Sequence, residues 1–357
     1  MLPLLTQQLL KDWDSLFPSV QRPADISYLG VAGGAEGGTT TFFAFGPGQV
    51  VPFFVVKVGR DATGGEAIIN EKDALLRLHE AGLPLASTVP KVVRCTEIEG
   101  TWMLVESTVE GAPMSVTVAK PGQPSASPAS RNFKLATDWL AAMQMQALSS
   151  EMDADTGAGL DSTVDQFVTS FNLSAEERAF IDQTITKESL TGARLVLRHG
   201  DYCPQNILLR GASSITGVVD WAFSQPSGLP LHDLLFFTSV YVQNARQSSD
   251  VLGFTQALRY AFFNQNPFSQ VVANHVLDYC RQMGIPTSTA KSLFCVFIME
   301  QAMFEYRKVE RAWARGWSAG FTAEAGEQGG PQTTPKVAMW AELFRTYVAT
   351  PERLIFQ

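Results

Sequence analysis

One stretch constrains this chain more than any other: residues 195–220, LVLRHGDYCPQNILLRGASSITGVVD. Its apolar segments 195–197 and 207–209 are typical of two buried strands, and a charged loop separates them. A turn at 211–214 and the apolar pair 218–219 follow. The pattern predicts a strand hairpin that holds three polar side chains at the mouth of one cleft, namely Asp201, Asn206 and Asp220.

The chemistry of these three side chains suits phosphoryl transfer. That reaction depends on placing Mg²⁺ against phosphates and on orienting the attacking hydroxyl. Asn206 and Asp220 carry the hard oxygen ligands that Mg²⁺ prefers, and Asp201 can accept the proton of a substrate hydroxyl. The spacing of His199, Asp201 and Asn206 repeats the H-x-D-x-x-x-x-N pattern of the kinase catalytic loop, and Asp220 follows where a metal-binding Asp is expected.

The segments HGDYCPQN and VVDWAFS together resemble the aminoglycoside phosphotransferase and choline kinase family, whose members have a protein-kinase-like fold. Gly200 after the histidine and Pro204 inside the loop favour this small-molecule branch over the protein kinases. The resemblance implies that His199 braces the loop. The alternative is a polar hairpin with incidental carboxylates.

A glycine-dense segment and a strand lysine precede this region. Residues 30–38, GVAGGAEGG, lie between two strand patterns, and Gly34 and Gly37 are candidates for backbone contacts with phosphates. A flexible hairpin turn is the competing interpretation. The strand 51–58, VPFFVVKV, carries Lys57 in an apolar interior, where an ammonium group needs a partner. We expect Lys57 to hold nucleotide phosphates.

The partner of Lys57 should come from the helix that follows, EAIINEKDALLRLHEAG. Glu71 is the first candidate and Glu66 the second, although either could be an ordinary glutamate of the helix surface. The resemblance then places the hinge between two lobes, with adenine-binding backbone groups, near Glu106 and Thr108. The sequence does not choose between ATP and GTP.

The remaining chain is predicted to be mostly helical. Residues 117–130 are predicted to form a surface loop before a helix at 132–149, and further helices are expected at 251–263, 271–283, 289–313 and 336–347. Asp233 opens an apolar helix, and the resemblance gives it a supporting hydrogen bond to the catalytic loop. An acidic, aromatic-edged acceptor pocket is predicted from Glu300, Glu305, Tyr306 and Trp313, although such residues are also typical of a helix's solvent face and core.

The fold class predicted is α+β. It is a protein-kinase-like bilobal fold with an antiparallel sheet and a helix in residues 1–106, and a larger, mainly helical lobe in residues 107–357. The net charge is −8 and the sequence contains no basic stripe, so a nucleic-acid partner is not expected. The negative charge is compatible with a cationic acceptor. The four cysteines are scattered, and no apolar run is long enough to span a membrane. We expect a cytoplasmic monomer or homodimer.

These patterns predict a Mg²⁺-dependent kinase that transfers the γ-phosphate of ATP or GTP to a hydroxyl of an aminoglycoside-like, amino-alcohol or sugar acceptor. A housekeeping choline, sugar or homoserine-type kinase and a nucleotide-binding pseudokinase are the alternatives. A protein kinase is disfavoured because only a short turn, and no activation loop, lies between Asp220 and Asp233.

Overall fold

The structure is a computed structural model that describes residues 1–31, 38–82, 84–118, 126–146, 154–211, 213–246, 251–314 and 334–356. Its contacts divide the chain into two compact units. The first comprises Met1–Ala112, His199–Asp201 and Asn206–Gln225, and the second comprises Pro113–Arg198, Tyr202–Gln205 and Pro226–Gln357. The predicted domain boundary after residue 106 stays a prediction, while the contacts group residues 199–201 and 206–225 with the N-terminal sheet.

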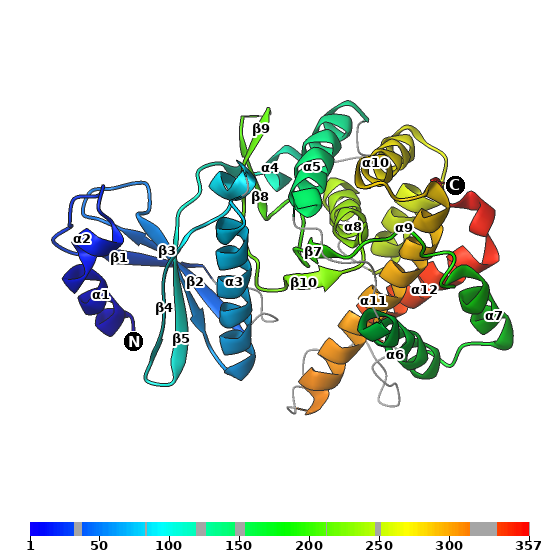
Figure 1. The fold of residues 1–357 in the computed structure, drawn as a ribbon, viewed down its shortest axis with the longest axis horizontal. Coiled ribbons are helices and arrows are strands. Elements are labelled where there is room, and N and C mark those ends of the chain that lie inside the picture. The colour runs from blue at the N-terminus through cyan, green and yellow to red at the C-terminus, as the bar shows by residue number, and fades with distance from the viewer. Residues whose placement is uncertain are drawn as a thin grey trace. The chain divides into compact units, whose positions relative to one another are not determined.

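An antiparallel five-stranded sheet forms the centre of the first unit (Figure 1). Its strands lie in the order β1-β2-β3-β5-β4. Their bounds are Ser27–Val31 for β1, Thr39–Phe45 for β2, Phe54–Gly59 for β3, Val92–Ile98 for β4 and Thr101–Ser107 for β5. The turn between β4 and β5 is formed by Glu99 and Gly100, which both have positive φ angles (52° and 76°), as a tight hairpin requires.

The two faces of β3 have different partners because side chains alternate along a strand. Phe54, Val56 and Val58 pack into one apolar cluster with Leu5, Leu9 and Trp13 from the helices α1 (Leu2–Lys11) and α2 (Trp13–Leu16). The residues between them, including Lys57, face the helix α3 (Ala62–Glu80), which lies along the other side of the sheet in Figure 1. The strand therefore presents its one charged side chain to α3.

The start of α3 is fixed by a cap and by close backbone packing. The Asp61 side chain accepts a hydrogen bond from the Gly64 N–H at 2.9 Å. A Cβ atom on Gly64 would lie 2.0 Å from the carbonyl oxygen of Gly38, so only glycine allows this approach. The first turn of α3 is thereby held against the end of the glycine-dense segment.

Residues 195–220 differ from the predicted hairpin in their strand pairing. Strands β8 (Ile207–Arg210) and β9 (Ser214–Val218) pair antiparallel and form a three-stranded sheet with β6 (Ala112–Pro113). Strand β7 (Val196–Arg198), however, pairs with β10 (Gln225–Gly228) and not with β8. The prediction of one continuous hairpin was wrong because strand pairing depends on distant segments that local patterns do not reveal.

The second unit is built mainly from helices (Figure 1). They are α4 (Ser115–Val118), α5 (Ala126–Gln146), α6 (Ala154–Ser170), α7 (Ala175–Thr184), α8 (His232–Arg246), α9 (Val251–Phe262), α10 (Pro267–Met283), α11 (Thr287–Ala314) and α12 (Pro335–Ala349). The short 3₁₀ helices are η1 (Pro84–Thr88) in the first unit and η3 (Pro351–Arg353) in the second. The α+β class, with an antiparallel N-terminal sheet and a helical C-terminal part, is confirmed.

One helix begins earlier than predicted. The predicted loop 117–130 is wrong at both ends, because α4 runs to Val118 and α5 already starts at Ala126. Pro128, which suggested a loop, lies in the first turn of α5, where the missing N–H breaks no intrahelical hydrogen bond. Residues 132–146 of the predicted helix lie inside α5, and its last residues, 147–149, lie outside the described residues.

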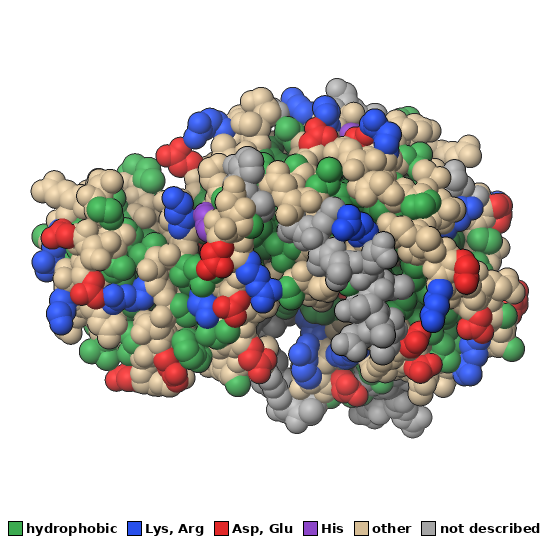
Figure 2. Space-filling view, viewed as in Figure 1, with side chains coloured by type: hydrophobic (Ala, Val, Ile, Leu, Met, Phe, Trp, Pro, Cys, Tyr) green, Lys and Arg blue, Asp and Glu red, His purple; other side chains and the backbone are tan. Residues whose placement is uncertain are grey.

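The surface shows mixed charge. Acidic and basic side chains are interspersed on the face shown in Figure 2. Among the helices that the structure describes, none combines the length and apolar character needed to cross a bilayer.

Candidate active site

The loop between β7 and β8 holds its polar residues through hydrogen bonds to its own backbone. Nδ1 of His199 accepts the backbone N–H of Asp201 at 3.2 Å, and Nε2 lies 3.1 Å from the carbonyl oxygen of Val219. Because Nδ1 is an acceptor here, Nε2 must carry the proton and donate it to Val219. The fully buried His199 ring therefore joins the Asp201 backbone to the strand that leads to Asp220.

Asn206 is brought directly to Asp201. Its Nδ2 atom donates to the backbone oxygen and to Oδ2 of Asp201, both at 2.9 Å. Its backbone oxygen accepts the N–H of Val219 at 3.0 Å. Since both N–H bonds of the Asn206 amide point at Asp201, its Oδ1 atom is the part of the side chain suited to a cation.

Gly200 allows the loop to turn between His199 and Asp201. Its φ angle is +80°, and an added Cβ would lie 2.1 Å from the carbonyl oxygen of Phe223. Any side chain at this position would clash with backbone. The Gly that the sequence places in HGD is thus a steric requirement of the loop.

Lys57 lies among carboxylates. Its Nζ atom is 2.5 Å from Oε1 of Glu71 and 3.1 Å from Oδ1 of Asp220. Oε1 of Glu71 also accepts the backbone N–H of Trp221 at 2.8 Å. Glu71 is buried on α3, whereas Glu66, the other candidate partner, is exposed on the same helix.

Asp220 is held in an uncommon backbone conformation. Its φ angle is 69°, in the left-handed region that residues other than glycine seldom adopt. Such a conformation costs on the order of 1 kcal/mol and persists only where the surroundings enforce it. Here the neighbouring N–H of Trp221 is held by Glu71 and the carboxylate of Asp220 by Lys57.

A third carboxylate, that of Glu106, faces the same ammonium. Glu106 lies on β5 opposite Val55 of β3, on the face that carries Lys57, and its Oε1 atom is 3.8 Å from Nζ. Its Oε2 atom is buried and has no hydrogen-bond partner among the described residues. Glu106 was predicted to mark the hinge through its backbone. The structure adds that its side chain lies inside the unit, while Thr108 follows the end of β5 at Ser107 and is half-buried.

Burial and charge together set the protonation of this cluster. Burial works against the charged form of Lys57, but Asp220, Glu106 and Glu71 outweigh it and hold its pKa well above the ordinary value. The Lys57 ammonium in turn lowers the pKa of Asp220. Burial raises the pKa of Glu71, and it raises the pKa of Glu106 to about 8, because the more distant Lys57 offsets the desolvation of Glu106 only in part.

One residue of this arrangement was missed in the sequence. Nδ2 of Asn70 on α3 donates to the backbone oxygens of Ala222 at 2.8 Å and Ser224 at 2.9 Å. Asn70 and Glu71 therefore hold the segment after Asp220 from two adjacent helical positions. In the sequence, Asn70 looks like any polar residue on the surface of a helix. Only its position next to Glu71 could have indicated that it binds the segment after Asp220.

Metal and phosphate ligands were predicted from oxygen-bearing side chains and glycines. The described residues contain no group of three or more His, Cys, Asp or Glu side chains placed to hold a metal. Asp220 and the amide oxygen of Asn206 suit Mg²⁺ all the same, because this ion is usually held by one or two protein ligands, waters and substrate phosphates. Gly34 and Gly37 lie outside the described residues.

In the second unit, Asp233 belongs to a buried polar network. Nε2 of Gln144 on α5 donates to Oδ2 of Asp233 and to the backbone oxygen of Leu197, both at 3.2 Å. The hydroxyl of Tyr279 donates to Oε1 of Gln144 at 2.5 Å and accepts the N–H of Leu231 at 3.2 Å. Gln144 thus connects Asp233 to strand β7, a contact that the sequence did not indicate.

The four predicted acceptor residues on α11 have separate surroundings. Glu300 forms a two-pronged ion pair with the buried Arg198, with N···O distances of 3.0 and 3.3 Å. Glu305 lies 3.5 Å from Lys308. Tyr306 packs near the ring of Phe171, at a centroid distance of 6.1 Å, and Trp313 is half-buried. Their joint role as an acceptor pocket stays a prediction.

Comparison with known proteins places this arrangement in a family. A sequence model of the phosphotransferase enzyme family matches residues 36–264, more than half of the chain. No curated protein matches significantly. Among solved structures, the chain is similar to the apoenzyme of macrolide 2'-phosphotransferase MphH from Brachybacterium faecium, with 16% identity, a TM-score of 0.43, and coverage of 85% of this chain and 96% of that chain. It is also similar to a macrolide 2'-phosphotransferase type I, with 13% identity, a TM-score of 0.42, and coverage of 87% and 95%.

The matched range contains the candidate site residues Lys57, Glu71, Asp201, Asn206 and Asp220. The chain belongs to the phosphotransferase enzyme family.

Proposed function

We propose that this phosphotransferase moves the γ-phosphate of ATP or GTP to a hydroxyl group of a small molecule in a Mg²⁺-dependent reaction. The observation that carries the proposal is the position of the Lys57 ammonium, 2.5 Å from Glu71 and 3.1 Å from Asp220. A buried cation beside a hard oxygen ligand is the arrangement that nucleotide phosphates and their metal ion require.

Lys57 would hold the nucleotide phosphates. Its pKa lies well above the ordinary value, so it stays an ammonium at neutral pH. Glu71 and Asp220 keep it in place, and a phosphate oxygen would take up its remaining N–H bond. Asp220 and Oδ1 of Asn206 would hold Mg²⁺, which when bound neutralises charge on the phosphates.

Asp201 would act on the acceptor. Asn206 donates to its Oδ2 atom at 2.9 Å and fixes the carboxylate plane. The carboxylate accepts the proton of the attacking hydroxyl as the new bond from oxygen to the γ-phosphorus forms. The bond from that phosphorus to the bridging oxygen of the nucleoside diphosphate breaks, and the bond electrons leave with the diphosphate.

The acceptor class proposed is an aminoglycoside-like molecule, an amino alcohol or a sugar. The net charge of −8 supports a cationic acceptor, because an acidic protein attracts cations over long range. We place the protein in the cytoplasm as a monomer or homodimer, without a nucleic-acid partner. A housekeeping kinase of choline, sugar or homoserine type is the alternative to an antibiotic-modifying enzyme.

The test is nucleotide consumption with Mg²⁺ over a panel of aminoglycosides, choline, amino alcohols and sugars, run on the wild type, Asp201→Asn and Asp182→Asn. Asp182 is an exposed acid of α7 and serves as a matched control. We expect acceptor-dependent consumption that Asp201→Asn lowers by about 10² to 10⁴-fold and Asp182→Asn leaves unchanged. Wild-type turnover in Asp201→Asn would remove Asp201 from the mechanism. Nucleotide binding without consumption for any acceptor would favour a pseudokinase.

A further inference from the structure

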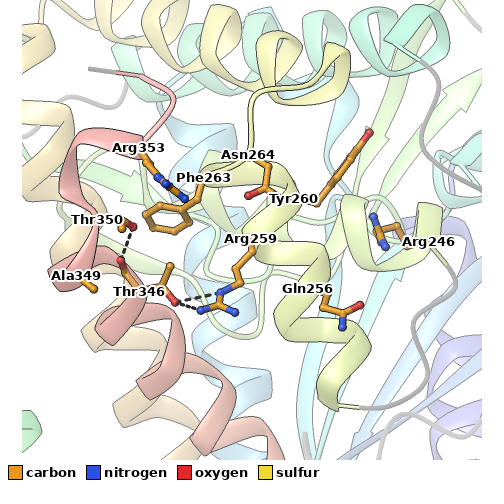
Figure 3. Close-up of a pocket in the computed structure, with 10 residues that line it drawn as sticks. All are labelled: Arg246, Gln256, Arg259, Tyr260, Phe263, Asn264, Thr346, Ala349, Thr350 and Arg353. Carbon is orange, nitrogen blue, oxygen red and sulfur yellow. Dashed lines mark hydrogen bonds between the residues drawn. The ribbon is translucent and has the colours of Figure 1, made fainter.

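A cavity lies in the helical unit. It has a volume of about 640 Å³ and is lined by residues of α8, α9, α12 and η3 (Figure 3). This volume is in the range of sites that hold small molecules. None of its lining residues belongs to the candidate active site.

Three arginines line this cavity, and each comes from a different element. Arg246 is the last residue of α8, Arg259 lies in α9 and Arg353 ends η3. No acidic residue is among the described residues that line it, although the chain as a whole has a net charge of −8. The cavity is therefore a local concentration of positive charge on an acidic protein.

The nearby acids neutralise this charge only in part. Oε1 of Glu342 lies 3.7 Å from Arg259 and Oε1 of Glu352 lies 4.0 Å from Arg353. Both glutamate side chains are more than half exposed, at 53% and 69%. Exposed pairs at such distances are screened by water and are weak, so an incoming anion can compete with them.

Two of the guanidinium groups are held in place before any ligand binds. Nε and Nη2 of Arg259 both donate to Oγ1 of Thr346, at 3.1 and 2.9 Å, as the dashed lines of Figure 3 show. The same hydroxyl donates to the backbone oxygen of Glu342 at 2.9 Å. The guanidinium of Arg246 lies over the ring of Tyr260, 5.0 Å from its centroid. Because these arginine side chains are already ordered, binding a ligand to them costs less side-chain entropy.

We propose that this cavity binds a phosphate-bearing ligand. The planar fork of arginine matches the oxygens of a phosphate group, and several arginines suit a group that carries more than one negative charge. Phosphate could belong to a small molecule in solution or to a lipid headgroup, and the experiment separates these sources.

The first arm is calorimetric titration of the full chain with inorganic pyrophosphate in the absence of Mg²⁺. The variants are Arg259→Gln and Arg353→Gln, with Arg281→Gln as the control. Arg281 is an exposed arginine of α10 that pairs with Asp278 and lies outside the cavity. We expect saturable binding that each cavity variant weakens by about tenfold or more and that the control leaves unchanged. Arg353 lies at the surface, so this variant should fold even if Arg259→Gln does not.

The second arm is sedimentation with phosphatidylcholine vesicles that contain or lack phosphatidic acid. Pyrophosphate binding that depends on Arg259 and Arg353 supports the proposal with a soluble ligand. Vesicle binding that requires phosphatidic acid and both arginines supports it with a lipid ligand. If neither probe binds saturably, or if both bind equally well to the cavity variants and the control, the proposal is wrong.

Discussion

Nζ of Lys57 lies 2.5 Å from Oε1 of Glu71, and that one oxygen also receives the N–H of Trp221 at 2.8 Å. A single carboxylate atom therefore positions both the ammonium group and the chain next to Asp220. Lys57 and Glu71 are both buried, so water cannot replace a missing partner. The position of Asp220 thus depends on a helix that is distant in sequence.

Glu71→Gln should disturb Lys57 and Asp220 together. Without the Glu71 charge, Lys57 is drawn toward Asp220 and Glu106, and the predicted metal ligand is displaced. We expect kcat/KM to fall by on the order of 10²-fold, as measured by steady-state nucleotide consumption. Glu66→Gln, an exposed change on the same helix, is the control and should leave the kinetics unaltered. Equal kinetics in the two variants would contradict the pairing role of Glu71.

Gly200→Ala should destabilise the protein by more than the backbone strain of a positive φ angle, because the new Cβ would also clash with backbone. Gly200 has a φ angle of +80°, and an added Cβ would lie 2.1 Å from the Phe223 carbonyl oxygen. Gly211 has a similar φ angle of +62°, but an added Cβ would meet no atom within 4 Å. Gly211→Ala therefore measures the backbone strain, expected to be about 1 kcal/mol. Gly200→Ala should cost roughly 2 kcal/mol more and abolish turnover, which urea unfolding and kinetics would check.

The linear spacing of the loop between β7 and β8 predicted much of the candidate site. His199, Asp201 and Asn206 lie within one loop, so their order along the chain determines their neighbourhood. Lys57 could be found because an ammonium group in an apolar strand requires a partner. These features are local, and the sequence displays them directly.

The remaining features depend on contacts between distant segments. Glu106 meets Lys57 only through the register of β3 against β5, in which Val55 is opposite Glu106. The pairing of β7 with β10 and the contacts of Asn70 with residues 222 and 224 are of the same kind. No periodicity within one segment encodes such a register, so the sequence could not predict these contacts.

Glu106 should make stability depend on pH. Burial raises its pKa from 4.5 to about 8, so between these values the folded state binds more protons than the unfolded state. The free energy of unfolding should therefore fall as the pH rises through this range. Glu106→Gln removes the titrating group and should be more stable than the wild type above pH 8, by up to roughly 5 kcal/mol, with little difference below pH 4.5.

The measurement is urea unfolding at both ends of this pH range. Glu97→Gln serves as the control, because Glu97 is an exposed acid on the adjacent strand β4. A difference between Glu106→Gln and the wild type that does not change with pH would show that Glu106 keeps an ordinary pKa.

The ion pair of Arg198 and Glu300 should contribute to stability as one unit. Arg198 is the last residue of β7, directly before His199, and its side chain is 5% exposed. Removal of Glu300 leaves a buried guanidinium whose Nε atom already has no hydrogen-bond partner among the described residues. Glu300 itself is 27% exposed, so Arg198→Met leaves a carboxylate that water can still reach. We therefore expect Glu300→Gln to destabilise the protein by roughly 2 kcal/mol and Arg198→Met by less.

A double-mutant cycle of these two changes, measured by urea unfolding, should give a coupling energy of about 1 kcal/mol or more. The same variants separate a structural from an acceptor-binding role of Glu300. If Glu300 only holds Arg198, both single variants should change kcat together with stability and leave the KM for the acceptor unaltered. If Glu300 binds a cationic acceptor, Glu300→Gln should raise that KM while Arg198→Met does not, because the ammonium group of the acceptor would contact the carboxylate edge that solvent reaches.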